Sequence, residues 1–590
     1  MKKIISLFLT LALLVGCTLI FASCGEPKDD GAEISVYLGE FVYDFDPTDY
    51  YVGSNAEQML SLLFDPLFAV NEKGKLKLDG AADSYDVDKE DRKIVIELKE
   101  TYWSDGVRVK AEDYVHAWRD ILLEPNNANP ASVLLFDIEN AAEIKRGEVP
   151  VSDFGAVASE TYQITITYRE GADYDMLLKN LASIATSPIR QDIVTTINSG
   201  YWSKFINTAV TNGAFMIGSI DHDANSFTLV RNTGYHQERD VKDTTKVVRP
   251  AKLISFITPT VDEAALTYDD IENKTVFYMG DASLAMRAEN KDDAMVADDL
   301  STYSYVFNMD NPLFKIEKVR QALSMAIDRN SVIEAITFGK AATGFLPPAV
   351  LDVDTGKTFT TEELISKSAG VDAAKALLAD VDFTGIDRTF TLTVNADEES
   401  KKIAEIVSAA WAAIGFTVKV EAVGTVENVV PSDEESSSDK DSKETFKDSE
   451  IQVIVNKASR GERDFDVIAV DWQMYSTDPF VALAAFSQNF SGCGAKLPDG
   501  DFLYGSFGGY ANAEYDALIE AAYNETDSEK RSEILHEAEE MLVNSACIVP
   551  IVFNESFAFV SDDLSKIKFD GFGNFVLVDT KQKNYRDYLD

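Results

Sequence analysis

The hydrophobic and polar positions in the first part of the chain follow two periods. Residues 93–98 (KIVIEL) and 162–168 (YQITITY) alternate with period two, which predicts half-buried strands, and residues 33–39 (EISVYLG) alternate like an edge strand. Residues 111–122 (AEDYVHAWRDIL) predict an amphipathic helix. Its apolar face is formed by Val115, Trp118, Ile121 and Leu122. This part of the chain should therefore combine strands with amphipathic helices.

The second half of the chain alternates between strand and helix patterns. Residues 389–394 (TFTLTV) and 416–423 (FTVKVEAV) alternate, and residues 401–415 between them carry an apolar stripe at helical spacing. This order predicts a βαβ unit with parallel strands. Residues 465–470 (FDVIAV) are a continuous apolar run, typical of a strand that is buried on both faces. The fold class that these patterns favour is α/β.

Two further segments, residues 317–329 and 528–546, predict amphipathic helices. Their apolar stripes are formed by Val319, Ala322, Leu323, Ala326 and Ile327 in the first, and by Ile534, Leu535, Ala538, Met541 and Leu542 in the second. Residues 431–450 (PSDEESSSDKDSKETFKDSE) are charged, rich in serine and nearly free of apolar residues, so they cannot pack a core. They predict a solvated loop inserted within the second α/β unit.

The N-terminus predicts export. Lys2 and Lys3 precede an apolar stretch up to Ala22, as in a secretion signal, although a permanent membrane anchor is the competing interpretation. Small residues and then Cys24 follow, with a polar tether behind them. This arrangement resembles a bacterial lipobox, which implies lipidation of Cys24 and removal of residues 1–23. Cys17 is the alternative, but cleavage there would leave the apolar sequence TLIFAS in the tether.

Composition excludes some classes of function. The 590-residue chain has a formal net charge of −46, and such an acidic surface repels nucleic acids, although simple solubility also accounts for it. Cys493 and Cys547 lack metal-ligand spacing, and the sequence leaves open whether they pair. The four histidines are not spaced as a metal motif, and neither HExxH nor GxSxG occurs. We therefore expect no enzyme, no metal and no cofactor.

An ordered set of motifs gives the chain a family resemblance. Residues 101–122 (TYWSDGVRVKAEDYVHAWRDIL) resemble the signature of the family-5 bacterial extracellular solute-binding proteins, which serve peptide ABC importers. Its matching positions are Trp103, Ser104, Asp105, Gly106, Val109, Ala111, Asp113, Val115 and Trp118. Similar matches follow in the family's order at residues 211–220, 229–236, 308–333 and 465–480, and then in GYANAEYDALIEAAYNE and CIVPIVFNES. The WSDG and AIDR strings themselves are expected to be scaffold.

The resemblance implies a fold and a set of domains. The fold would be the two-lobed periplasmic-binding-protein-like fold of type II, in the large cluster with an extra domain, and its ligand cleft would lie between the lobes. Lobe I would comprise residues 34–65, 205–300 and 546–590, with the extra domain at 66–204, behind a polar tether at 24–33. Lobe II would comprise residues 301–545, including the acidic insert at 431–450.

The resemblance also points to a binding site in DWQMYSTDPF, residues 471–480. In peptide-binding relatives an aspartate of this segment holds the peptide's α-ammonium, and Tyr475 stands at that position here. Asp471 or Asp478 then replaces it, or the ligand has no free amine; Asp478 is alternatively a turn cap before Pro479. Trp472, Gln473 and Tyr475 are the other predicted contacts on this wall. Tyr50, Tyr51 and Phe136 are predicted for the opposite wall.

The predicted function is a lipid-anchored, substrate-binding lipoprotein on the outer face of the bacterial cytoplasmic membrane. It would act as a monomer that captures oligopeptides or dipeptides and delivers them to the permease subunits of an ABC importer. One alternative keeps the fold but binds an oligosaccharide or a metal chelate. Another is a surface receptor or interaction protein without a role in transport.

Overall fold

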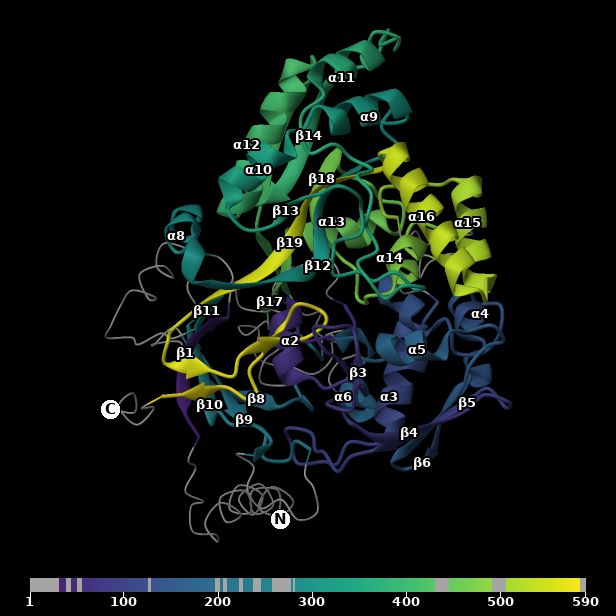
Figure 1. The fold of residues 1–590 in the computed structure, drawn as a ribbon, viewed down its shortest axis with the longest axis vertical. Helices are drawn as coiled ribbons and strands as arrows, with labels where there is room; N and C mark the ends of the chain where they lie inside the picture. Colours follow the sequence, from purple (N-terminus) through teal and green to yellow (C-terminus); the bar gives the residue numbers. More distant parts are fainter. Residues whose placement is uncertain are drawn as a thin grey trace, which may run out of the picture.

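The computed structural model describes residues 31–38, 44–49, 56–125, 129–196, 202–204, 209–221, 226–236, 246–256, 277–279, 282–429, 445–490 and 506–583. Within these residues the chain forms two lobes, one above the other in Figure 1, which share one large mixed sheet. We call the lower part, which contains strands β1 and β8 to β11, lobe I, and the upper part, which contains strands β13 to β15 and β18, lobe II.

Two long antiparallel strands connect the lobes. They are β12 (Ala294–Phe307) and β19 (Ile548–Val560). The pairing of β12 with β19 is interrupted between Asp298 and Thr302, and β12 begins to pair with β18 only at Ser301. On the other side of the interruption, β19 pairs with β11 of lobe I. The interruption therefore lies where the two lobes meet, and we call residues 298–302 the hinge segment.

The sheet of lobe II follows the order β15-β14-β18-β12-β19 and has helices on both faces. Val467 and Ala469 of β18 pack with helices α9 to α12, whereas Ile468 and Val470 pack with α14 to α16. This confirms the prediction of a strand buried on both faces. The elements are β13 (Lys340–Ala341), β14 (Thr389–Asn395), β15 (Thr417–Val423), β18 (Val467–Gln473), α9 (Glu317–Met325), α10 (Arg329–Ile336), α11 (Val371–Leu378), α12 (Glu398–Ala413), α14 (Pro479–Ala484), α15 (Ala513–Asn524) and α16 (Ser528–Ser545).

The predicted βαβ unit is present. Strands β14 and β15 pair in parallel, starting at Thr389 and Thr417, and α12 connects them. The two predicted amphipathic helices correspond to α9 and α16, although α9 ends at Met325, so that Ala326 and Ile327 follow it as buried residues.

In lobe I, the prediction of an edge strand at residues 33–39 is wrong. Strand β1 (Glu33–Leu38) pairs in parallel with β10 on one side and β11 on the other. Alternation along a strand reports how its two faces are covered, and it does not report how many neighbours the strand has. The remaining strands and helix of this part are β8 (Phe215–Asp221), β9 (Ser226–Arg231), β10 (Lys252–Phe256), β11 (Phe277–Met279) and α2 (Ala56–Leu63).

A second sheet, in the order β4-β5-β7-β6, lies beside these strands with its own helices. The predicted strands at residues 93–98 and 162–168 correspond to β5 and β7, which pair antiparallel. The elements here are β4 (Ala82–Asp88), β5 (Lys93–Leu98), β6 (Ala156–Glu160), β7 (Gln163–Thr167), α3 (Ala111–His116), a π-helical turn (Ala117–Leu122), a 3-10 helix η2 (Pro130–Leu135), α4 (Ala141–Lys145), α5 (Tyr174–Asn180) and α6 (Gln191–Thr196). Short two-stranded sheets are formed by β2 (Ala69–Val70) with β3 (Leu76–Lys77), β20 (Leu564–Ser565) with β23 (Lys581–Gln582), and β21 (Lys568–Phe569) with β22 (Phe575–Val576), and α8 is Leu284–Glu289.

The WSDG motif acts as scaffold in this structure. Asp113 caps the start of α3, because its Oδ2 accepts the backbone N–H of Lys110 (2.9 Å) and the indole N–H of Trp103 (3.1 Å). Gly106 has a φ of +83°, which favours glycine. A capped helix start and a tight turn together account for the motif without any ligand.

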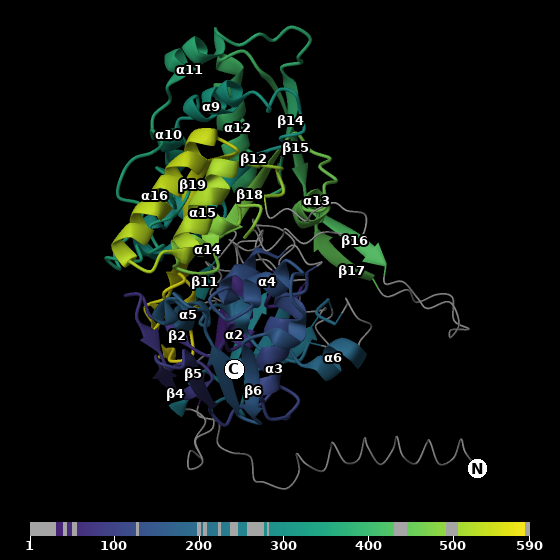
Figure 2. The ribbon, with the colours of Figure 1, turned by 90° about the vertical axis from the view of Figure 1, so that its right-hand side faces the viewer.

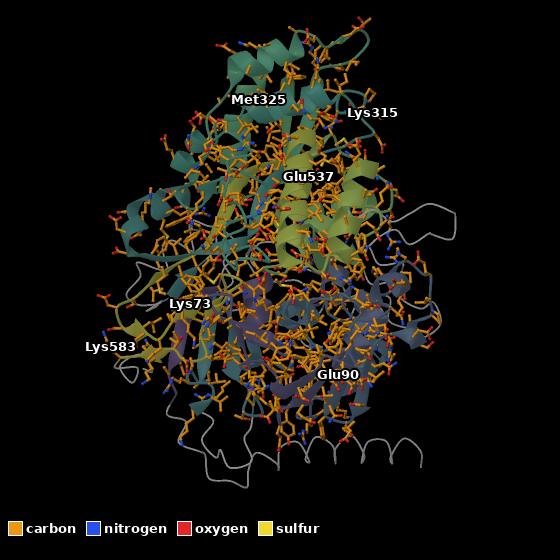
Figure 3. All side chains as sticks on the ribbon, turned by 45° about the vertical axis from the view of Figure 1, so that its right-hand side comes forward. Lys73, Glu90, Lys315, Met325, Glu537 and Lys583 are labelled. Carbon is orange, nitrogen blue, oxygen red and sulfur yellow. The ribbon has the colours of Figure 1, made fainter. Side chains whose placement is uncertain are left out.

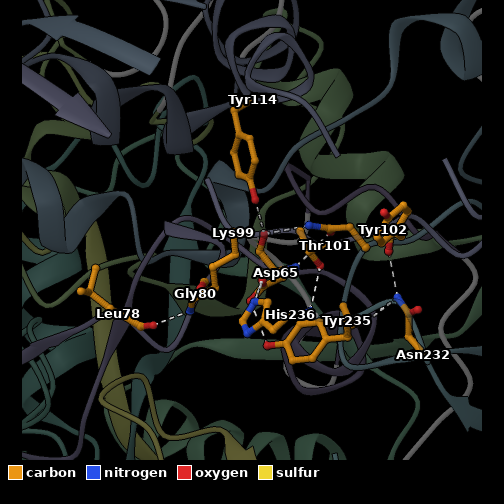
Figure 4. Close-up of polar contacts among 12 residues, drawn as sticks. Asp65, Leu78, Gly80, Lys99, Thr101, Tyr102, Tyr114, Asn232, Tyr235 and His236 are labelled. Atoms are coloured by element: carbon orange, nitrogen blue, oxygen red, sulfur yellow. Dashed lines mark hydrogen bonds and ion pairs between the residues drawn. The ribbon is translucent and has the colours of Figure 1, made fainter. Parts of the chain in front are cut away.

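A polar network around Asp65 holds the neighbouring segments together (Figure 4). Its carboxylate contacts His236 Nε2 (2.6 Å) and accepts a hydrogen bond from the hydroxyl of Tyr235 (3.3 Å), and its carbonyl oxygen accepts one from the hydroxyl of Tyr114 (2.9 Å). Asn212 donates to the same carbonyl (3.0 Å). Because these residues come from distant parts of the sequence, the network ties the end of α2 to α3 and to the turn after β9.

The predicted acidic loop ends in regular structure. Residues 430–444 lie outside the described residues, but strand β17 (Thr445–Ser449) pairs antiparallel with β16 (Thr425–Val429), and α13 (Glu450–Ala458) follows. The prediction of a loop is therefore wrong for residues 445–450. Composition favoured a loop, but a short hairpin needs few buried apolar residues.

Charged groups cover the outside of both lobes. The side chains of Lys73, Glu90, Lys315 and Glu537, labelled in Figure 3, are all exposed. No helix in the part of the chain that the structure describes is long and apolar enough to cross a membrane. The signal, Cys17, Cys24, Tyr50, Tyr51 and Cys493 lie outside these residues, whereas Cys547 is buried as a free thiol.

Candidate functional site

The last residues of β18 have an open backbone edge. The N–H of Met474 donates to the carbonyl of Leu300 (2.8 Å), so the even-numbered residues of β18 direct their backbone groups toward β12. The N–H and C=O groups of Asp471 and Gln473 then point to the opposite side. On that side β14 pairs only with Val467 and Ile468. Among the residues that the structure describes, the end of β18 therefore has no strand neighbour there, and an extended chain could pair with it.

A tight turn follows the open edge. Tyr475 is 3% exposed and has a φ of +60°, which is unusual for a residue other than glycine. The N–H of Ser476 donates to the carbonyl of Met474 (2.8 Å), which closes a turn centred on Tyr475. The hydroxyl of Ser476 donates to Asn180 Oδ1 at the end of α5 (2.6 Å). This strained turn thus joins lobe II to the second sheet region of the lower half.

A second contact between the lobes involves a buried carboxylate. Gln473 Nε2 donates to Glu57 Oε2 on α2 (2.6 Å), and Asn574 Nδ2 donates to Glu57 Oε1 (3.0 Å). Glu57 is 7% exposed, and its burial raises its pKa well above the usual value, with a further contribution from Asp299 and Asp570. One amide donor from each side thus satisfies both oxygens of this buried carboxyl group.

Asp471 lies at the hinge segment. Asn554 of β19 donates both to Asp471 Oδ1 (2.8 Å) and to Ser301 Oγ (2.8 Å), so one amide links β18, β12 and β19. Burial raises the pKa of Asp471 to about 7, and the nearby carboxylates of Glu399 and Asp397 add to this effect. A cation bound beside Asp471 would favour its ionised form.

Trp472 points to the other face of β18. Its ring stacks on Phe486 (centroids 4.7 Å apart) and Phe507 (5.9 Å) and meets Phe345 edge-on (5.9 Å), and it is 3% exposed. Three protein rings therefore surround the indole in this structure, and its clearest role is to fix the path of β18.

Glu539 of α16 holds the loop that contains Phe345, the residue whose ring meets Trp472 edge-on. Its Oε1 accepts the backbone N–H groups of Phe345 (2.8 Å) and Leu346 (2.9 Å), and the residue is 1% exposed. Burial raises the pKa of Glu539 to about 7. This carboxylate satisfies two backbone donors that would otherwise be buried without acceptors.

Glu539→Gln should change how stability depends on pH. Because the pKa of Glu539 is higher in the folded than in the unfolded chain, its contribution to stability is complete below about pH 4.5 and is lost as the pH rises through about 7. Between about pH 5 and about pH 8, the free energy of unfolding should shift in favour of the glutamine variant by about 2 kcal/mol. Urea titrations of both proteins at the two pH values measure this shift. Parallel pH dependences would contradict the assignment.

The other predicted contacts have different surroundings. Asp478 is 1% exposed and caps α14 by accepting the N–H of Phe480 (2.9 Å), with Arg531 at 3.8 Å. The alternative role as a turn cap is therefore present in the structure. Phe136 packs against Phe490 (6.4 Å), and its carbonyl accepts the hydroxyl of Tyr523 (2.8 Å). It lies where η2 meets α14 and α15. Tyr50 and Tyr51 lie outside the described residues.

Sequence patterns did not reveal Glu57, Asn180 and Asn554. Glu57 is one acid within the apolar segment AEQMLSLL, Asn180 has no motif around it, and Asn554 lies in the family-like string CIVPIVFNES, which does not mark it as a contact. Glu57 and Asn180 meet their partners where the lobes touch, and Asn554 meets its partners across the shared sheet. In the part of the chain that the structure describes, no group of His, Cys, Asp and Glu side chains is suited to a metal ion.

Comparison with known proteins identifies the family. The model of the bacterial extracellular solute-binding proteins, family 5 (Middle), matches residues 79–492, which is more than half of the chain. The chain belongs to this family. Family-5 solute-binding proteins are binding proteins of transport systems.

This family-5 protein aligns over most of its length with relatives from several bacteria. The dipeptide-binding protein DppE of Bacillus subtilis is 25% identical over 482 residues, which cover 80% of this chain and 78% of DppE. The periplasmic oligopeptide-binding protein OppA of Haemophilus influenzae is 24% identical over 560 residues, 93% of each chain. The structure of Listeria monocytogenes OppA bound to peptide has a TM-score of 0.74 at 20% identity and covers 94% of this chain and 99% of its own. The structural similarity confirms the two-lobed fold.

Proposed function

We propose that this family-5 protein captures peptides and delivers them to the permease of an ABC importer. The peptide would lie extended between the lobes and pair through its main chain with the open edge of β18. Main-chain pairing is tolerant of peptide sequence, because every residue offers the same N–H and C=O groups. The relatives named above, which bind dipeptides or oligopeptides, support the class of ligand.

The observation that carries the proposal is the position of the open edge. Asp471 and Gln473 direct their backbone groups away from β12, and Gln473 pairs with Ser301 of the hinge segment. Gln473 and Ser476 both contact the other lobe. A ligand bound at this edge would touch both lobes at once. Its binding would favour the arrangement in which the lobes are in contact.

We assign the residues of the site as follows. Asp471 and Gln473 would bind the peptide backbone, and the carboxylate of Asp471 would receive a positively charged group of the ligand, because Asp478 already caps a helix. Trp472 and Tyr475 would shape the strand exit, and Phe136, Tyr50 and Tyr51 remain candidates for the opposite wall. The proposal retains the predicted domain segments, lipidation at Cys24 and anchoring to the outer face of the membrane, and it retains action as a monomer.

Native mass spectrometry tests the proposed function. The chain from residue 25 onward would be purified without denaturation, its mass recorded, and any released molecule identified after unfolding. We expect one bound peptide per protein molecule, in a mixture of sequences. A sugar, a chelate or no adduct after incubation with a mixed peptide digest would contradict peptide capture.

A further inference from the structure

The β16–β17 hairpin contacts lobe I through an ion pair that the peptide site does not involve. Lys204 Nζ donates a hydrogen bond to Asp448 Oδ1 of β17 (2.8 Å) and another to Asp44 Oδ2 (2.6 Å). The hairpin follows β15 at the outer edge of the lobe II sheet and precedes α13 and β18. It projects from lobe II beside the lower half of the molecule in Figure 2.

Lobe I holds Lys204 in place independently of the hairpin. The N–H of Phe45 donates to the carbonyl of Ser203 (2.8 Å), which fastens the segment before Lys204 to the loop that contains Asp44. Asn129 donates from its side-chain amide to the carbonyl of Thr48 in that loop. The ammonium group is thus positioned by lobe I, and Asp448 is the only one of its two named partners that comes from lobe II.

The contact is largely withdrawn from water. The side chains of Lys204, Asp448 and Asp44 are 18%, 21% and 30% exposed. Burial acts to lower the pKa of Lys204, but the carboxylates of Asp44 and Asp448 outweigh it and raise the pKa, so Lys204 is charged at neutral pH. Charge-assisted hydrogen bonds in such partly buried surroundings are stronger than those on an open surface.

We propose that Asp448 and Lys204 form a latch that holds the two lobes together. When the lobes separate, Asp448 would leave with the hairpin while Asp44 remains beside Lys204, so that no buried ammonium group is left without a carboxylate. The latch can therefore open and close repeatedly at a modest cost in free energy. It concerns the arrangement of the lobes and not the identity of the ligand.

Carbodiimide cross-linking of the ligand-free chain tests the contact directly. This reagent joins an amine and a carboxylate that already touch, without a spacer. We expect two products in the mass spectra of digested protein, one joining Lys204 to Asp448 and one joining Lys204 to Asp44. The second product is an internal control, because both of its residues belong to lobe I. Formation of the Lys204–Asp44 product alone would overturn the proposal.

Substitution tests whether the contact holds the lobes together. Asp448→Asn should raise the ratio of open to closed molecules about fivefold, as expected for the loss of one charge-assisted hydrogen bond, and so increase the radius of gyration in X-ray scattering. Lys204→Met should have a similar effect, and the double variant should add nothing further. The matched control is Lys402→Met, which removes an ion pair with Glu405 (2.8 Å) inside lobe II. An unchanged radius of gyration in Asp448→Asn would rule out a latch.

These tests use no ligand, so their outcome is separate from that of the proposed function. The latch can be absent in a protein that binds peptides, and it can be present in one that binds another solute.

Discussion

Replacing Asp471 by proline should reduce peptide affinity at least about a hundredfold, which corresponds to about 3 kcal/mol. Proline has no N–H to donate, and its ring occupies the space beside the open edge of β18. The N–H of residue 471 faces away from β12, so the substitution removes no backbone hydrogen bond of the sheet, and Asn554, which loses the Asp471 carboxylate, keeps Ser301 as an acceptor. The loss should therefore fall on ligand binding far more than on folding.

Asp471→Asn is the matched control for this experiment. It keeps the backbone N–H and nearly the same shape but removes the charge, so the two variants separate the backbone from the carboxylate. Titration calorimetry with a peptide recovered from the native protein measures both affinities, and urea unfolding confirms that both chains are folded. If the proline variant bound the peptide as tightly as the unchanged protein, the pairing of ligand with β18 would be wrong.

Local sequence patterns predicted which faces of a strand or helix are buried and which neighbouring elements pair. The continuous apolar run at residues 465–470 predicted a strand that is buried on both faces. The strand-helix-strand pattern around α12 predicted the parallel pair β14 and β15. The neighbours of β1 could not be predicted in this way, because pairing depends on segments more than two hundred residues away. The register change at the hinge segment likewise has no signature in the sequence.

The sequence predicted which segment contains the candidate site, but it did not predict which residues from other segments contact it. Family resemblance placed it at residues 471–480, and the open edge of β18 lies there. The partners of this segment come from other elements: Phe486 and Phe507 stack on Trp472, and Glu57 meets Gln473. A residue's own sequence neighbours say nothing about such partners, because the rings meet only when lobe II folds and Glu57 meets Gln473 only when the two lobes pack.

The arginine of the AIDR motif, Arg329, allows a test of whether this motif supports the fold. Arg329 is 0% exposed, and its guanidinium donates to the carbonyl oxygens of Pro550 (2.8 Å) and Ser324 (3.3 Å) and to the hydroxyl of Ser324 (3.2 Å). Burial lowers the pKa of Arg329 to about 9. The residue therefore connects α10 to β19, which pairs with strands of both lobes.

Arg329→Ala should lower the free energy of unfolding by about 3–5 kcal/mol, because it leaves a cavity and buried carbonyl groups without donors. Arg329→Lys should cost less, since an ammonium group keeps the charge but reaches fewer of these acceptors. Arg460→Ala, the same exchange at an exposed position, should change stability by less than about 0.5 kcal/mol. Denaturant unfolding of the three variants measures the differences. An Arg329→Ala protein as stable as the Arg460→Ala protein would show that the motif does not support the fold, and its role would then have to be sought in binding or in movement of the lobes.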